Sequence, residues 1–204
     1  MSKTDMKIGL SYPAGWVQLP VGLSKKLEGD RQLAAWADQA AQRMLGDADP
    51  DAVRERARQL VHLTVSCRAR NDRSGLAFYP ESADGMVAML DVTSYAPDRE
   101  NPVITLELLE EIYATPTADT IGDVLKSRVS LPSGPAVRVR ATRVEEPDPT
   151  GHGTVMEGVT HAIRPPAFDG AVVATMTWTV LQLGDKLAEM ADAIARTIRV
   201  TPAR

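Results

Sequence analysis

The chain has 204 residues and a mass of 22.0 kDa, which is enough for one domain with a continuous core. Hydrophobic residues make up 44% and charged residues 25%, and these ordinary fractions exclude collagen-like, coiled-coil and wholly disordered chains. The formal net charge of −4 argues against a general attraction to nucleic acid or anionic lipid, which both favour clustered positive charge. We therefore expect a single folded domain over residues 1–204 and no nucleic-acid partner.

The sequence carries no targeting signal that we recognise. Cys67 is the single cysteine and cannot form a disulfide within the chain. The opening residues MSKTDMKIGLSYPAGW lack the apolar core of a signal peptide, and no apolar run approaches the roughly 20 residues that span a bilayer. We expect a cytoplasmic protein without membrane insertion. Arg outnumbers Lys and Ala is abundant, a bias typical of GC-rich genomes such as those of actinobacteria.

The first third of the chain predicts two strands and two helices. Residues 7–21 contain two short apolar runs split by a Pro-x-Gly turn, which predicts a β-hairpin or a strand with a sharp corner. Over residues 30–46, apolar side chains recur every three or four positions, which predicts a helix. Asp49 can cap a second helix that has Pro50 in its first turn. Residues 31–70 are therefore expected to form a helical hairpin.

The middle third mixes clear and ambiguous patterns. Two extended runs, GLAFYPE and MVAMLDVTSY, flank the pair Asp84-Gly85, which is a hairpin signal. The following run VITLELLEEIYA fits either a strand or a short helix. Residues 117–128 place apolar side chains at helical spacing, so we predict a helix there.

The last third predicts a meander of three antiparallel strands. The first strand, PAVRVRATRVEE, alternates Val137 and Val139 on one side with Arg138 and Arg140 on the other, as a half-solvated strand does. The runs TVMEGVTHAIRPP and AVVATMTWTVLQL supply the next two strands, and KLAEMADAIARTI predicts a final helix. The expected fold class is α+β, with a twisted antiparallel sheet of about six strands flanked by helices.

Aromatic residues are scarce, at 4% of the chain, so the core should be mainly aliphatic. Three tryptophans occupy positions that suit anchors of such a core. They are Trp16 at the opening corner, Trp36 on a helix stripe and Trp178 in the middle of a strand.

Three segments together resemble the PsbP-like superfamily, which includes LpqN-type actinobacterial proteins. They are the corner Tyr12-Pro13-Ala14-Gly15-Trp16, the strand LPSGPAVRVRA and the closing strand and helix AVVATMTWTVL and MADAIARTIRVTP. The resemblance covers roughly residues 7–21 and 85–201. It implies an antiparallel sheet flanked by helices, and a non-catalytic protein-binding or assembly module linked to an actinobacterial secretion or envelope system. No functional residue carries over, because the superfamily shares no catalytic motif.

The candidates for catalysis are few. His62, His152 and His161 have no metal-ligand spacing, so we expect neither a metal nor a cofactor. His152 lies in a Gly-His-Gly loop and is either a polar loop tip or the general base of a small hydrolase or isomerase. His161 is expected to be a hydrogen-bonded residue on a sheet face. No GxSxG, GxGxxG or P-loop motif occurs, so the sequence favours binding over catalysis.

One charged row is the candidate binding site. Arg138 and Arg140 lie two positions apart on the predicted strand, so their side chains share a face. Extended by Arg143 or Arg164, they would form a row of guanidiniums that pairs with carboxylates of a protein partner. The alternatives are a solvated sheet face, or a face covered by the acidic helix at residues 107–111. The sequence names neither the partner nor the oligomeric state.

Overall fold

The structure is a computed structural model. It describes residues 6–22, 27–70, 74–80, 85–100, 102–144, 153–166 and 168–202. The α+β fold class is confirmed in this part of the chain, which contains both α-helices and antiparallel strands.

The elements follow the chain in this order. The strands are β1 (Met6–Gly9), β2 (Trp16–Leu19), β3 (Ser74–Phe78), β4 (Ala88–Tyr95), β5 (Thr120–Leu131), β6 (Gly134–Val144), β7 (Val155–Ile163), β8 (Ala171–Trp178) and β9 (Arg199–Pro202). The helices are α1 (Leu27–Leu45), α2 (Pro50–Ala69), α3 (Leu106–Ala114), the short 3-10 helix η1 (Leu181–Leu183) and α4 (Gly184–Ala195).

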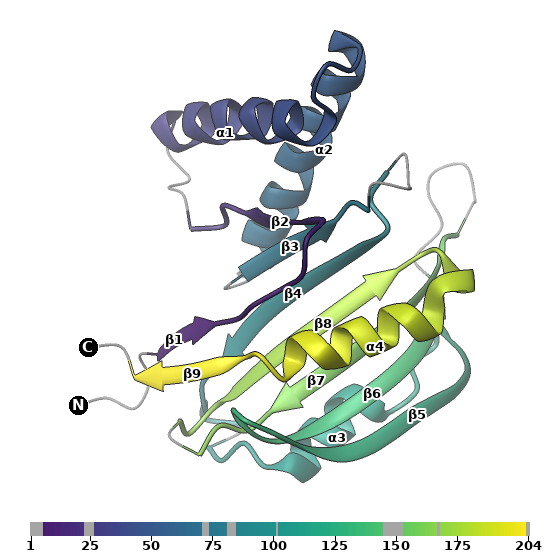
Figure 1. Ribbon diagram of the computed structural model, residues 1–204. Coiled ribbons are helices and arrows are strands. Elements are labelled where there is room, and N and C mark those ends of the chain that lie inside the picture. The colour runs from purple at the N-terminus through teal and green to yellow at the C-terminus, as the bar shows by residue number, and fades with distance from the viewer. Residues whose placement is uncertain are drawn as a thin grey trace.

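The main sheet has seven strands in the order β2-β3-β4-β8-β7-β6-β5, and every neighbouring pair is antiparallel. The expected meander is present as β6, β7 and β8, and seven strands stand where about six were expected. A second sheet pairs only β1 with β9, so strands from the two ends of the chain lie side by side (Figure 1).

The opening segment forms a corner, and the hairpin alternative is wrong. β1 pairs with β9 while β2 pairs with β3, so the two runs belong to different sheets. Gly15 makes the corner with a φ of 87°, a conformation that favours glycine. A Cβ there would also lie 2.9 Å from the Phe78 ring. The ring of Trp16 stacks on Phe78 with centroids 5.1 Å apart, which fixes the direction of the chain into β2.

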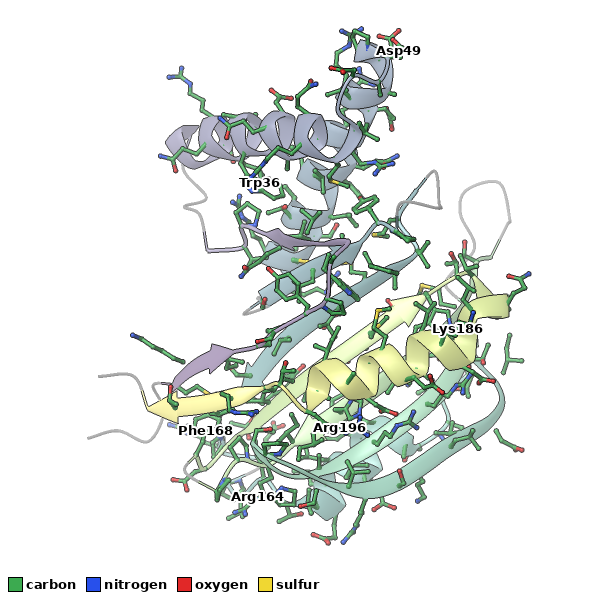
Figure 2. The ribbon with its side chains drawn as sticks, viewed as in Figure 1. Trp36, Asp49, Arg164, Phe168, Lys186 and Arg196 are labelled. Atoms are coloured by element: carbon green, nitrogen blue, oxygen red, sulfur yellow. The ribbon has the colours of Figure 1, made fainter. Side chains whose placement is uncertain are left out.

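The two predicted helices of residues 31–70 are confirmed as α1 and α2. The Asp49 side chain accepts a hydrogen bond of 3.1 Å from the Asp51 backbone N–H, and Pro50 occupies the first turn of α2. The helices pack on each other (Figure 1) and on β2 and β3 through an aliphatic cluster. Trp36 packs against that cluster from the side of α1 turned toward the sheet (Figure 2).

The structure resolves the ambiguous run in favour of a helix. Residues 106–114 form α3, and the Thr105 hydroxyl caps it by accepting a 3.1 Å hydrogen bond from the Leu108 backbone N–H. The run begins on β-branched residues, but this cap and the polar face of α3 favour a helix over a strand.

The helix predicted over residues 117–128 is wrong, because residues 120–128 belong to strand β5. Its pairing with β6 shifts register between Ile121 and Leu125, and Gly122 adopts a φ of 68°. Such a bulge interrupts the two-residue alternation of a strand, so the apolar residues on either side of it fall at helical spacing. Pairing with β6 over nine positions outweighs the helical pattern.

Helices cover both faces of the main sheet. α4 packs on one face over a core that includes Val159, Met176 and Trp178. α3 packs on the opposite face over Val137, Val139 and Val173, as Figure 1 shows with α4 in front of the sheet and α3 behind it. The cluster beneath α2 includes Ala77 of β3 and Met89 of β4. Their neighbours along each strand face α4, so Ala77 and Met89 point to the opposite face. α2 therefore lies on the same face of the sheet as α3.

Candidate functional site

The first two predicted site residues lie under α4 and are paired within the chain. Arg138 and Arg140 share one face of β6, as the alternation requires. Arg138 donates from Nε to Asp192 Oδ1 at 2.7 Å. Arg140 donates from Nε to Glu157 Oε1 at 2.6 Å and from Nη1 to Asp185 Oδ1 at 2.8 Å. Two of these carboxylates come from α4, so α4 and not the acidic helix at 107–111 covers the row.

Glu157 of β7 joins three elements at the start of α4. Its carboxylate accepts from Arg140 and, at 3.1 Å, from the Trp178 indole N–H of β8. The Gly184 backbone approaches the same carboxylate so closely that a Cβ at this position would collide with it. Glycine at the first residue of α4 therefore allows the helix backbone to contact the Arg140–Glu157 ion pair directly.

His161 sits beside Arg138 in the same layer. Its side chain is buried, at 2% exposure for the residue, and Nε2 lies 2.9 Å from Asp192 Oδ1. Burial lowers the pKa of His161, although the Asp192 charge opposes that shift. Burial alone would raise the pKa of Asp192, but the hydrogen bond and charge of Arg138 bring it below its ordinary value. The predicted hydrogen-bonded sheet histidine is what the structure contains.

The other two predicted arginines lie elsewhere. Arg143 is exposed on the α3 face of β6. It lies an odd number of positions along the strand from both Arg138 and Arg140, so its side chain points to the opposite face. Arg164 follows β7, where its Nε donates to the Ile104 carbonyl at 2.8 Å near the foot of the sheet in Figure 2. The four residues do not form one row, and a partner-binding role for them stays a prediction.

The acidic residues of α3 have partners of their own on β5. Glu110 lies 2.7 Å from Lys126 Nζ, and Arg128 bridges Glu107 and Glu110 at 3.0 and 3.2 Å. Hydrogen bonds from Lys126 and Arg128 hold the pKa of Glu110 below its usual range. These exposed pairs link α3 to the edge strand of the sheet.

Two further expectations concern catalysis and membranes. His152 lies outside the residues that the structure describes, so its role as a general base stays a prediction. Across the described ranges, no three His, Cys, Asp or Glu side chains are grouped closely enough to hold a metal ion. None of the helices in those ranges is both long and apolar enough to cross a membrane.

A pocket on the opposite face of the sheet is the candidate site that the sequence did not reveal. We call it the α2 pocket, and its volume is about 470 Å³. One wall is α2 and the other is the end of β3 with the start of the following chain. Its lining residues are Glu55, Arg58, Gln59, His62, Leu63, Tyr79, Gly85 and Met86.

Tyr79 is the buried polar residue of the α2 pocket. It is 7% exposed, and its hydroxyl has no hydrogen-bond partner among the described residues. The guanidinium of Arg56 lies over its ring, 4.3 Å from the ring centroid, which is a cation–π arrangement. Burial raises the pKa of Tyr79, so the hydroxyl keeps its proton at neutral pH.

The rim of the α2 pocket is charged and open. Arg58 Nη1 lies 3.1 Å from Oε2 of Glu55, one turn earlier on α2, with the two side chains 74% and 56% exposed. Exposed pairs of this kind contribute little to stability and exchange readily with other partners. Gln59 and His62 add polar groups, while Leu63 and Met86 add apolar surface. The arrangement can bind a group that offers a hydrogen-bond acceptor beside an apolar moiety.

A signal for this site was present in the helix pattern. Residues 55, 58, 59 and 62 recur at three- and four-residue spacing and form a polar stripe on α2. The stripe borders the buried face of the helix, and no local pattern says which side chain it meets. Tyr79 reaches it only through the pairing of β3 with β2 and β4.

Comparisons with known proteins give only distant similarity, to solved structures. No protein-family model matches the chain, and no curated protein matches its sequence. Among solved structures, the crystal structure of LpqN, described as involved in cell envelope biogenesis of Mycobacterium tuberculosis, is similar with 13% identity and a TM-score of 0.48. The similarity covers 98% of this chain and 86% of that chain. LpqN is the protein type that the sequence resemblance named, and we infer neither partner nor location from a relationship this distant.

Proposed function

We propose that this chain is a non-catalytic protein-binding module and that the α2 pocket is its recognition site. The observation that carries the proposal is the open α2 pocket itself, where the apolar side chains Leu63 and Met86 lie beside the exposed Arg58.

The size and openness of the pocket favour a protein segment as the ligand. A volume of about 470 Å³ falls in the range of ordinary ligand sites, roughly 300–1,000 Å³. Met86 is 38% exposed and Arg58 is mostly exposed, so the rim is accessible from solvent. An open rim suits a side chain or a short stretch of a partner protein better than it suits a fully enclosed small molecule.

The arginines under α4 are less suited to a partner, because each already has a carboxylate at hydrogen-bonding distance. A partner would have to displace a part-buried ion pair before it gained one of its own. At the α2 pocket it would displace only the exposed Arg58–Glu55 pair. The free energy of association therefore favours the α2 pocket.

We also propose an association with an actinobacterial secretion or envelope system. The support is the sequence resemblance to the PsbP-like superfamily and the Arg and Ala bias of the composition. The proposal that the α2 pocket is the recognition site does not depend on this association.

A photo-crosslinking experiment on the full chain tests the proposal. The photoreactive residue p-benzoylphenylalanine replaces Met86 at the rim, and replaces the exposed Ile112 of α3 as the control. We expect a discrete adduct from position 86, mapped to one segment of one protein, and none from position 112. Gln59→Trp, which fills the pocket, should abolish the adduct. Adducts that persist in the Gln59→Trp background, or no adduct from position 86, would overturn the proposal.

A further inference from the structure

Resting on the proposed function, we infer that the partner recognised at the α2 pocket is a second copy of this chain. The two copies are related by a two-fold axis beside α2, and their α2 helices run antiparallel across it. Glu55 of one copy pairs with Arg58 of the other, and the axis repeats the same pair in reverse. Met86 of each copy enters the pocket of the other.

One side of α2 is exposed along the whole helix. Its residues recur at three- and four-residue spacing, so they form a single line, which we call the α2 ridge. The members of the α2 ridge, all exposed, are Asp51, Glu55, Arg58, His62, Val65 and Ala69. The start of α2, marked by Asp49 in Figure 2, lies at the end of the molecule farthest from the main sheet. A second copy can therefore reach the α2 ridge without meeting the sheet.

The charges on this side of α2 suit an identical surface better than a ligand of one charge. Asp51 pairs with Arg54, and Glu55 pairs with Arg58, so the acidic and basic side chains cancel. An acidic ligand would meet Glu55 beside Arg58, and a basic ligand would meet Arg58 beside Glu55. In a two-fold contact, the interaction of one residue with another is repeated with the roles of the copies exchanged. Each carboxylate can then face a guanidinium.

The exchange of ion pairs leaves no charge without a partner. Within one copy, Arg58 Nη1 lies 3.1 Å from Glu55 Oε2, and both side chains are mostly exposed. Exposed pairs of this kind contribute little to stability, so giving them up costs little. Each copy loses one internal pair and the dimer gains two pairs between copies. These new pairs are shielded from water by the contact, which strengthens their attraction.

The α2 pocket supplies apolar area that the α2 ridge lacks. A helix of 20 residues is about 30 Å long and 10–12 Å wide, so its exposed side offers on the order of 300 Å². A specific interface buries roughly 600–800 Å² on each partner. The contact must therefore extend over the α2 pocket, where Leu63 is half-buried and Met86 is 38% exposed. The unbranched Met86 side chain can adapt to the pocket of the other copy.

Sedimentation velocity of the purified full chain, from low micromolar to millimolar concentration, tests this inference. We expect the mean mass to rise from 22.0 kDa toward twice that value, with a Kd in the micromolar range because the interface is of modest area. Gln59→Trp, which fills the pocket, should keep the chain monomeric. With p-benzoylphenylalanine in place of Met86, the purified chain should crosslink to itself, whereas the Ile112 control should not.

Charge-reversed variants make the result specific to the two-fold contact. Glu55→Arg and Arg58→Glu should each raise Kd about tenfold or more, because symmetry places each substitution in the interface twice. A mixture of the two variants should dimerise about as tightly as the natural chain, since one copy then supplies two cations and the other two anions. Glu107→Arg and Arg128→Glu change the net charge equally at an exposed pair between α3 and β5. These controls should change Kd less than twofold.

The outcomes separate this inference from the proposed function. A chain that stays at 22.0 kDa throughout the series, or a dimer that Gln59→Trp and Glu55→Arg leave unchanged, would overturn the second copy as the partner. So would a mixture of the two charge-reversed variants that associates no better than either variant alone. In each case the proposed function stands if position 86 crosslinks to a different protein, and fails if it crosslinks to none.

Discussion

Two regions of this molecule contain arginines in contrasting surroundings, part-buried in one region and exposed in the other. Under α4, Arg138 and Arg140 meet Asp192, Glu157 and Asp185 within the chain. On the α2 face, Arg58 forms an exposed ion pair with Glu55, its neighbour on the helix, and the nearby Tyr79 hydroxyl has no partner in the described chain. The comparison teaches that a row of charges on a strand is a stabilising device when another element supplies its counter-charges. An exposed ion pair at the rim of a pocket, which a partner can exchange at little cost, is the better sign of a binding site.

The largest expected effect is the loss of the carboxylate that joins β6, β8 and α4. Glu157→Ala leaves Arg140 and the Trp178 indole N–H without their acceptor. Because the pair is part-buried, we expect the free energy of unfolding to fall by about 2–4 kcal/mol. Urea denaturation measures it, with Glu55→Ala as the exposed control, for which at most about 0.5 kcal/mol is expected. Equal effects at the two positions would remove the distinction between the regions.

A smaller loss is expected at the next pair along α4. Asp192→Asn keeps the shape of the side chain but removes the charge that faces Arg138 and His161. We expect a loss of about 1–3 kcal/mol, measured by the same denaturation experiment. Glu189→Gln, an exposed position on α4, should change the stability by less than about 0.5 kcal/mol. A neutral Asp192→Asn variant would show that α4 docks by its apolar residues alone.

The His161 layer also predicts a pH dependence. Burial lowers the pKa of His161 in the folded chain, so below about pH 6.5 the unfolded chain binds a proton that the folded chain does not. Stability should therefore fall as the pH drops from about 6.5 toward the lower folded pKa. The lowered pKa of Asp192 acts only below about pH 4, where protonation of its carboxyl removes further stability.

Replacing His161 separates its contribution to the pH dependence of stability from that of the other titrating groups. His161→Gln should be less stable than the natural chain at pH 7.5, and its stability should decline less between pH 6.5 and 5. Parallel declines in the two proteins would contradict an assignment to His161.

The smallest effect, and one of opposite sign, belongs to the α2 pocket. Tyr79→Phe removes a buried hydroxyl that has no partner in the described chain, so the free energy of unfolding should stay constant or rise by up to about 1 kcal/mol. Thermal denaturation measures the change. A clear loss of stability would mean that the hydroxyl is already satisfied.

Most of the fold could be predicted from local patterns, since alternation, caps and turn residues act over a few positions. The meander, α4 and the capped start of α2 at Asp49 follow from such patterns. Residues 117–128 could not, because a bulge around Gly122 imitates helical spacing. No local sequence pattern predicts the pairing of β1 with β9.

The candidate site was harder to predict than the fold. The shared face of Arg138 and Arg140 follows from alternation, but two of their three partners come from α4, about 50 residues later in the chain. The α2 pocket joins a helix stripe to Tyr79 at the end of a strand. The partners of the two arginines and the position of Tyr79 beside α2 both depend on which elements become neighbours in the fold. The sequence pattern of a single segment does not predict that.

The pairing of β1 with β9 has a consequence for the order of folding. β1 is synthesised long before its only partner strand in the described sheets, which comes near residue 200. In the main sheet, β4 likewise waits for β8, more than 70 residues downstream. Contacts this distant along the chain slow folding, because a long loop must close before the contact forms. The early half therefore emerges with an unpaired strand edge, and the sheet closes only when the last third of the chain arrives.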